Sequence, residues 1–333
     1  MDITHGSPID GDRGSAVTIG AYDGVHRGHR ALLRLLRELA DARGLNAALV
    51  TFDKHPAQVV RPESAPKLLT SLPQKLELLD ATGLLDVCRL LRFDEQRRHE
   101  SAEDFVREVL VGELRARLVV VGADFHFGHR RAGNVALLER MGADLGFEVV
   151  GLGLVSPATD GSAASEWDAS DHEAYSSTRI RGLLADGDVA GAARLLGRPH
   201  EVRGTVETGD RRGRDLGFPT ANIAVPDEIA MPADGIYAGT LVSAGDERPA
   251  ALSLGHRPTF HDDQRHSLLE AHVLDFDGDL YGRSVAVCFV ERIRGEEKFD
   301  TVDDLVVRIR RDVAETRRIL GEARESGSPD SPW

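Results

Sequence analysis

The chain has 333 residues, of which 41% are hydrophobic, and a formal net charge of −14 at pH 7. This length suggests two domains at ~150 residues each. The acidic balance argues against a broad nucleic-acid or anionic-membrane surface, because both ligands need a basic face. A small anionic substrate stays compatible, since phosphates bind at helix N-termini and local arginines.

We infer the location in the cell from the targeting and membrane-spanning signals that the sequence lacks. No apolar run approaches the ~20 residues that span a bilayer. Residues 1–15 lack the basic start and apolar core of a signal peptide, and we expect them to form a disordered lead. Cys88 and Cys288 lie far apart in apolar stretches without a CxxC pattern, so buried thiols in strands are expected. A reducing cytoplasm is the default compartment.

The first half of the chain alternates strand-like and helix-like segments. We expect strands at 16–19, 47–51, 87–90, 118–121 and 147–152. We expect helices at 28–43, 73–82, 102–111 and 135–145. Such repeated units predict a parallel sheet with helices on both faces, whose sites lie at the carboxyl ends of the strands.

The second half of the chain has a different pattern of predicted elements. Residues 156–174 are small, polar and acidic, which predicts a loop or insertion, and helices at 178–185 and 189–196 follow. Short β-prone pieces separated by turns then predict a small antiparallel barrel, with strands at 201–207, 237–242, 250–253, 268–274 and 284–290.

A helix closes the second half. Its apolar stripe contains Leu305, Ile309, Val313 and Leu320, and Asp300 or Thr301 is expected to cap it. The tail after it is expected to be disordered. We place the two domains at 14–186 and 187–324.

The segment 18–29 leaves a strand, turns on glycines and enters a helix. His26 and His29 are three residues apart, so they share a face once helical. We expect Gly20, Asp23 and Gly28 to bind nucleotide there, beside the free N–H groups of the helix. Two imidazoles donate hydrogen bonds to charge that develops at an α-phosphate. The alternatives are two surface histidines or a zinc pair, for which no third ligand is obvious nearby.

Two further segments are candidates for substrate contact. Ser177 and Thr178 open a helix, and Arg179 and Arg181 are placed to hold a pyrophosphate leaving group. A capped surface helix is the alternative. The loop 122–128 follows the strongly β-prone strand and is expected to contact substrate.

The segment 203–222 is rich in glycine and arginine, including Gly204, Gly209 and Arg214. A loop of this composition permits close backbone approach to phosphate. Thr220 and Asn222 offer oxygens acceptable to Mg²⁺. A surface turn is the alternative.

We expect the strand 268–274 to provide the general base that deprotonates the hydroxyl group receiving the phosphate. Alternation there places Glu270 on one face with His272 and Leu274. A positioned carboxylate would take the proton of an attacking hydroxyl. An exposed strand carboxylate is the alternative.

Several motifs of the first half occur in a recognisable order. They are TIGAYDGVHRGH (18–29), TFDKHP (51–56), LTSLPQKLELL (69–79), GADFHFG (122–128) and SSTRIR (176–181). Together they resemble the adenylyltransferase module of the prokaryotic bifunctional riboflavin kinase/FAD synthetase family. The resemblance implies a Rossmann-like nucleotidyltransferase domain that transfers AMP from ATP to FMN, giving FAD and pyrophosphate with Mg²⁺.

The resemblance also assigns residues of that module. His26 and His29 match the α-phosphate histidines of the family. The second phosphate-binding motif matches Ser177, Thr178 and Arg179, and the flavin side matches Asp53, His55, Asp124 and Phe125.

The second half resembles the riboflavin kinase module of the same family. The motifs are GDRRGRDLGFPTAN (209–222), GIYAG (235–239), GHRPTF (255–260), EAHVLDFDGDLYG (270–282) and EEKFD (296–300). This module is a small β-barrel that phosphorylates the ribityl 5′-hydroxyl with ATP. The resemblance implies that Thr220 and Asn222 serve magnesium and phosphate, and that Glu270 is the general base.

Other functions stay open at this stage. Ala21 and Lys54 replace residues more usual in the family, so a riboflavin kinase with an impaired adenylyltransferase half is one alternative. A flavin-binding regulatory protein that kept the fold is another. A cytidylyltransferase or pantetheine-type adenylyltransferase shares the HxGH pattern but lacks the barrel motifs. Riboflavin, FMN and ATP are the expected partners, and the sequence leaves the oligomeric state unknown.

Overall fold

The computed structural model describes the chain except residues 6–12, 153–174, 210–212, 214–215, 257–266 and 326–333. Contacts divide it into two compact units. The first unit holds Met1–Pro66 and Ser71–Ser176, and the second unit holds Lys67–Thr70 and Ser177–Trp333. The predicted acidic insertion and the tail after the last helix fall on residues outside this description.

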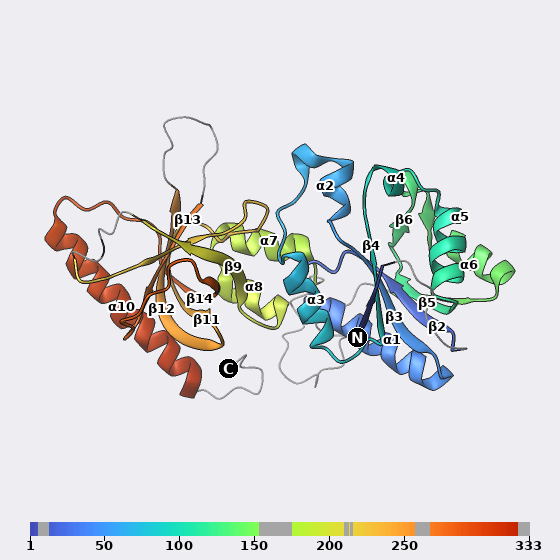
Figure 1. The fold of residues 1–333 in the computed structure, drawn as a ribbon, viewed down its shortest axis with the longest axis horizontal. Helices are drawn as coiled ribbons and strands as arrows, with labels where there is room; N and C mark the ends of the chain where they lie inside the picture. The colour runs from blue at the N-terminus through green and yellow to red at the C-terminus, as the bar shows by residue number, and fades with distance from the viewer. Residues whose placement is uncertain (6–12, 153–174, 210–212, 214–215, 257–266, 326–333) are drawn as a thin grey trace, which may run out of the picture. The chain divides into compact units, whose positions relative to one another are not determined.

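The first unit is built on a parallel sheet of six strands in the order β1-β4-β3-β2-β5-β8 (Figure 1). The strands are β1 (Asp2–Thr4), β2 (Ser15–Ile19), β3 (Asn46–Phe52), β4 (Val87–Leu91), β5 (Ala116–Gly122) and β8 (Glu148–Leu152). Every neighbouring pair is parallel, as predicted. The chain runs outward from β2 through β3 to β4 and then returns to place β5 on the other side of β2. This reversal of strand order flanks the carboxyl end of β2, where such sheets bind ligands.

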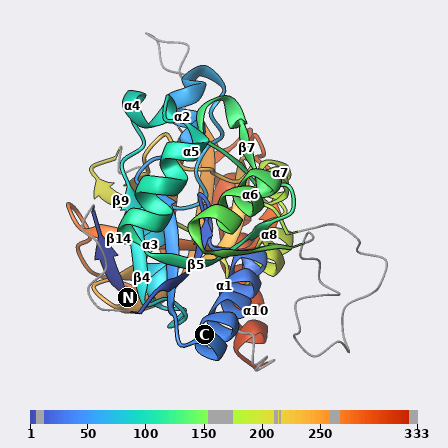
Figure 2. The ribbon, with the colours of Figure 1, turned by 90° about the vertical axis from the view of Figure 1, so that its right-hand side faces the viewer.

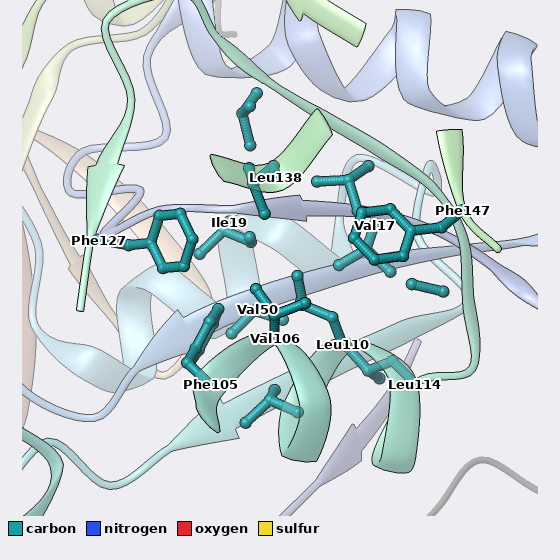
Figure 3. Packing of buried hydrophobic residues seen from close by; sticks show 14 of the residues in the cluster. Val17, Ile19, Val50, Phe105, Val106, Leu110, Leu114, Phe127, Leu138 and Phe147 are labelled. Carbon is teal, nitrogen blue, oxygen red and sulfur yellow. The ribbon is translucent and has the colours of Figure 1, made fainter. Parts of the chain in front are cut away.

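Helices cover both faces of this sheet (Figure 2). One face carries α1 (Arg27–Arg43) and α3 (Leu72–Asp80), and the other carries α5 (Ala102–Phe105), η2 (Val106–Glu113) and α6 (Val135–Leu145). Successive residues of a strand point to opposite faces. Val17 and Ile19 therefore pack toward Val106 and Leu138 in one core cluster, shown in Figure 3. Ala16 packs into the other cluster with α1.

The ends of these helices follow capping rules. The Ser71 hydroxyl accepts from the Gln74 N–H and the Gln74 side chain accepts from the Ser71 N–H, a capping box that starts α3. Gly44, with φ of 64°, ends α1 in the left-handed conformation. The predicted helix over 102–111 continues instead as the π-helix η2. Shorter elements complete the unit: α2 (Pro56–Val60), η1 (Pro62–Ser64), α4 (Glu95–Arg98), β6 (His126–Phe127), η3 (His129–Arg131) and β7 (Gly133–Asn134).

The expectation of a disordered lead over residues 1–15 is wrong for Asp2–Thr4. These residues form β1, which pairs in parallel with β4 at the edge of the sheet. The Asp2 N–H donates to the Asp86 carbonyl at 2.8 Å. A strand of three residues is too short for an alternation of apolar residues to be recognised, and its pairing depends on backbone groups that every sequence has. The composition therefore gave no sign of it.

The second unit contains a closed antiparallel barrel in the order β10-β13-β12-β11-β14-β9, which confirms the predicted barrel. Its strands are β9 (His200–Glu207), β10 (Ala221–Ala224), β11 (Gly235–Ser243), β12 (Asp246–His256), β13 (Ser267–Val273) and β14 (Ser284–Arg294). Tyr237, Leu252 and Phe289 fill its interior with 0% exposure. The segment 203–222, expected as a loop, begins within β9 and ends in β10.

Three helices accompany the barrel: α7 (Ser177–Asp186), α8 (Val189–Leu196) and α10 (Val302–Glu325). Helix α8 packs on β9 and β14, and α10 packs on β11, β12 and β14. The Asp304 N–H donates to the Thr301 hydroxyl at 3.1 Å, so Thr301 is the cap of α10. By contacts α7 belongs to the second unit, whereas the domain limits expected from the sequence place it in the first.

Candidate active sites

The turn after β2 has an unusual backbone. Tyr22, Gly24 and Val25 adopt positive φ angles of 51°, 83° and 41°. Two of these three residues carry side chains that rarely take this conformation, which concentrates at functional sites. The turn delivers His26 to the N-cap of α1, where its Nδ1 accepts the His29 N–H at 3.3 Å.

The two histidines come together by stacking rather than as helical neighbours, because His26 precedes the first turn of α1. Their ring centroids lie 3.6 Å apart at 15°, and the Tyr22 ring stacks on His29 at 4.6 Å. His26 is buried and His29 half-buried. Burial, followed by the positive charge of His26 and Lys75, lowers the pKa of His29 well below 6.5. A neutral His29 keeps one N–H to donate, and its Nδ1 has no partner in the described part of the chain.

Close packing requires glycine at position 28, in addition to the nucleotide-binding role predicted for it. A Cβ at this position would lie 2.8 Å from Cβ of Tyr175, and 3.3 Å from the His26 ring. The glycine therefore lets the start of α1 approach both neighbours. Gly20 and Asp23 lie in the same turn, where the Gly20 N–H donates to the Val50 carbonyl at 3.0 Å and Asp23 is buried.

A buried lysine that the sequence analysis did not assign lies behind this turn. The ammonium of Lys75, on α3, donates to the carbonyls of Ala21 and Phe52 and to the Thr51 hydroxyl. Lys75 is 8% exposed, and burial lowers its pKa to about 8. The available signal was a lysine four residues before the buried Leu79 on an otherwise apolar helix face.

The two residues of the TFDKHP motif have local partners. The Asp53 carboxylate accepts the Phe93 N–H at 2.8 Å, which ties the end of β3 to the end of β4. His55 is the N-cap of α2, and its Nδ1 accepts the Ala57 N–H at 3.2 Å. Their assignment to flavin binding stays a prediction, beside these structural contacts.

The remaining residues assigned to the adenylyltransferase site fall in two places. Asp124 and Phe125 follow β5, the strand beside β2, so they share the carboxyl edge of the sheet with the histidines. Ser177, Thr178 and Arg179 open α7 in the second unit.

Arg181 has a partner in the second unit too. Its Nε donates to the Lys67 carbonyl at 2.5 Å, and both residues belong to that unit.

The barrel carries a cavity of about 680 Å³ beside α10. Asn222 on β10 and Glu270 on β13 are register partners, and both line this cavity together with Thr220. Its apolar wall is formed by Ile236, Leu252, Leu268, Phe299, Leu305, Ile309 and Val313. As predicted from alternation, His272 shares the face of Glu270, and its ring bonds the Pro219 carbonyl at 2.9 Å.

The side chain of Asn222 is closely packed. Its Oδ1 is buried and has no hydrogen-bond partner among the described residues. A Cβ on Gly209 would lie 2.0 Å from Asn222 Nδ2, so glycine at 209 leaves room for this amide. Gly204 is required for a different reason: a Cβ at this position would lie 2.3 Å from the Ala224 carbonyl oxygen on the neighbouring strand. Arg214 lies outside the described residues.

A second cavity of about 450 Å³ shares Thr220 with the first. It is lined by Ala221 of β10 and by Ala271 and Val273 of β13, which alternate with the residues lining the larger cavity. The two cavities therefore lie on opposite faces of the β10–β13 wall.

A buried ion pair closes the larger cavity at α10. The Arg294 guanidinium at the end of β14 donates two hydrogen bonds to Asp312, from Nη2 at 2.7 Å and from Nε at 3.1 Å. The two side chains are 10% and 7% exposed. The sequence analysis did not find this pair, because its partners are far apart in the chain and neither lies in a motif.

Comparisons with known proteins identify the family of both halves of the chain. A model of FAD synthetase matches residues 9–164, and a model of riboflavin kinase matches residues 196–320. A bifunctional riboflavin kinase/FMN adenylyltransferase from Escherichia coli strain K12 is 36% identical over 92% of this chain and 93% of the relative. The chain belongs to the bifunctional riboflavin kinase/FMN adenylyltransferase family. The resemblance seen in the sequence is thereby confirmed, and both domains of the family are present.

Other family members give the same picture. A protein of the same description from Pseudomonas fluorescens is 36% identical over 92% of this chain and 93% of its own length. Another, from Listeria monocytogenes, is 34% identical over 94% of this chain and 95% of its own length. A crystal structure described as a macrolide-efflux protein from Streptococcus pneumoniae superposes with a TM-score of 0.81 at 30% identity, covering 95% of this chain and 99% of that one. Among the described residues of the present chain, no helix is long and apolar enough to cross a membrane.

Proposed function

We propose that the second unit phosphorylates riboflavin with ATP to give FMN, and that the first unit transfers AMP from ATP to FMN to give FAD and pyrophosphate. One observation carries the kinase half most directly. The Glu270 carboxylate, the Asn222 amide and Thr220 converge on one largely apolar cavity next to a second, smaller one. An apolar pocket with few convergent polar groups suits a flat aromatic ring that carries a hydroxylated chain.

In the kinase half, the larger cavity takes riboflavin and the smaller one takes the nucleotide. Glu270 accepts the proton of the ribityl 5′-hydroxyl as its oxygen attacks the γ-phosphorus of ATP, and ADP leaves. Thr220 lines both cavities, so the reacting phosphate is expected beside its hydroxyl. The protein contributes position and charge rather than a covalent intermediate.

The donor set at this site fits Mg²⁺. The buried Oδ1 of Asn222 has no hydrogen-bond partner within the described residues, and an amide or hydroxyl oxygen is a suitable ligand for this cation. Asn222 and Thr220 would hold the ion, which supplies neutralisation of phosphate charge. No cluster of three or more His, Cys, Asp or Glu side chains arranged for a metal occurs among the described residues, so the proposed ligands are the neutral oxygens.

In the adenylyltransferase half, a phosphate oxygen of FMN attacks the α-phosphorus of ATP and pyrophosphate leaves. The neutral His29 and the neighbouring His26 donate N–H groups to the α-phosphate oxygens as negative charge develops there. Asp53, His55, Asp124 and Phe125 contact the flavin. The location of the histidine stack at the reversal of strand order supports this assignment.

The alternative with an impaired adenylyltransferase half started from Ala21. The contacts of that residue run through its backbone, since its carbonyl accepts hydrogen bonds from Lys75 and Thr51 at 3.2 Å each. This supports a turn whose shape does not depend on the side chain at position 21. The free thiols of Cys88 and Cys288 are compatible with the proposed reducing cytoplasm.

The test is an incubation of the purified protein with riboflavin, ATP and Mg²⁺, with flavins separated by chromatography over time. We expect FMN to form first and FAD to follow. FMN that never advances to FAD would leave only the kinase. Riboflavin binding without any product would favour the regulatory protein instead.

A further inference from the structure

The segment PQKLELL (73–79) is part of the family resemblance, but neither reaction proposed above uses it. Its lysine, Lys75, is the single cationic residue of α3 and is buried, at 8% exposure. An ammonium has three N–H donors and no acceptor. In Lys75 these three donors meet three oxygens, at 3.2 Å from Ala21 O, 3.2 Å from Thr51 Oγ1 and 2.7 Å from Phe52 O.

The three oxygens belong to two different loops of the proposed adenylyltransferase site. Ala21 starts the turn that ends in the histidine stack. Phe52 ends β3 and directly precedes Asp53. Thr51 joins the two, because its hydroxyl accepts from Lys75 and donates to the Ala21 carbonyl at 3.2 Å. A single side chain from α3 thus fixes the carboxyl ends of β2 and β3 relative to each other.

We propose that Lys75 is a positioning residue for adenylyl transfer, which holds the phosphate-binding turn (20–29) against the loop that carries Asp53 and His55. The inference rests on the adenylyltransferase activity proposed above. Lys75 touches neither substrate in this account. It acts through the backbone of Ala21 and Phe52, and so sets the distance between the histidines and the flavin-side residues.

Two carboxylates balance the charge of Lys75. Asp23 follows β2 and Asp53 follows β3; both favour the ammonium, while burial opposes it most strongly. The Cys88 thiol in β4 and the neutral His29 at the start of α1 also lie near it. The resulting pKa of about 8 lies close to neutral pH. Above it the amine has two N–H donors and a lone pair, so one of the three oxygens faces a lone pair. The turnover number of FAD synthesis should therefore fall as the pH rises through this pKa.

Two neighbouring groups titrate outside this range. Burial raises the pKa of the Cys88 thiol to about 11, and the pKa of His29 lies well below 6.5. We therefore expect an alkaline limb near pH 8 in FAD synthesis that depends on Lys75. A purely structural role would reduce the amount of active protein, and would leave the shape of the pH profile unchanged.

The test compares Lys75→Met with Arg140→Met, which removes a positive charge from an exposed position of α6 in the first unit. FAD synthesis from supplied FMN and ATP is measured across the pH range around the Lys75 pKa, and riboflavin phosphorylation serves as the second readout. We expect Lys75→Met to lower kcat of FAD synthesis about 100-fold, as displacement of reacting groups by ~1 Å does. The alkaline limb should vanish in Lys75→Met, and Arg140→Met should retain it. A Lys75→Met enzyme that keeps the limb would overturn the proposal.

A second pair of variants keeps the lysine. Thr51→Val removes one acceptor and Thr51→Ser retains it. Loss of an acceptor destabilises the ammonium, so the alkaline limb should move to lower pH in Thr51→Val and stay in place in Thr51→Ser. Identical profiles for the two variants would overturn the role of Lys75 even if Lys75→Met fails to fold. Absence of FAD from the unmodified protein would overturn the proposed activity as well, so the two failures are distinguishable.

Discussion

Gly209→Ala should separate the two activities by moving a single side chain. The new Cβ would lie 2.0 Å from Asn222 Nδ2, whereas ordinary van der Waals contact begins at 3.4 Å. The amide must therefore move away by ~1 Å or more. Gly209 does not have a positive φ angle, so alanine causes no backbone strain there. The side chain that has to move is the proposed ligand of Mg²⁺.

A displacement of ~1 Å among positioned groups costs about 100-fold in turnover. We expect Gly209→Ala to lower kcat of riboflavin phosphorylation by this factor and to leave FAD synthesis from supplied FMN unchanged. Gly321→Ala is the matched control, because a Cβ there meets nothing within 4 Å. Both activities are measured by chromatography of the flavin products in the presence of Mg²⁺.

A double-variant cycle identifies the cause. If Gly209→Ala acts only through Asn222, then the substitution should have no further effect in an Asn222→Ala background. Full additivity of the two substitutions, or kinase activity close to that of the unmodified protein in Gly209→Ala, would refute the reasoning.

Two further substitutions test the site assignments, and a third, with its matched control, tests the buried ion pair. His29→Ala should lower FAD formation about 100-fold through loss of a donor to the α-phosphate, with FMN formation intact; equal loss of both, measured on the same sample, would contradict two separate sites. Glu270→Gln should lower riboflavin phosphorylation by about 100-fold or more and spare AMP transfer to supplied FMN; normal kinase turnover would remove Glu270 from the role of base. Arg294→Met breaks the buried pair with Asp312 and should lower the free energy of unfolding in urea by ~3 kcal/mol. Arg318→Met, which breaks an exposed pair, should cost under ~1 kcal/mol, and similar losses for the two would argue against burial as the cause.

The parallel sheet and the barrel were predictable because their strands carry local patterns. The run Leu118–Val121 is apolar throughout, as expected for a strand buried on both faces, and Glu270 alternates with apolar neighbours. The histidines were predictable because glycines mark the turn that leads to them. In each case the signal lies within a few consecutive residues.

Other parts of the fold and site depend on contacts between distant segments. β1 is paired through its backbone alone, and β10 has four residues that follow a glycine-rich stretch. The partners of Lys75 are 23 to 54 positions away in the chain, and Arg294 is 18 from Asp312. A lysine or arginine side chain in a helix or strand is usually exposed to solvent. Only the folded structure shows which of these side chains is buried.

The wall formed by β10 and β13 gives the proposed kinase an unusual route for its phosphate. The two cavities use alternate residues of the same strands, so a single layer of backbone divides them. Thr220 is the residue common to both, beside the start of β10, where this layer ends. In the proposed kinase reaction, the phosphoryl group would therefore pass from donor to acceptor around the end of one strand.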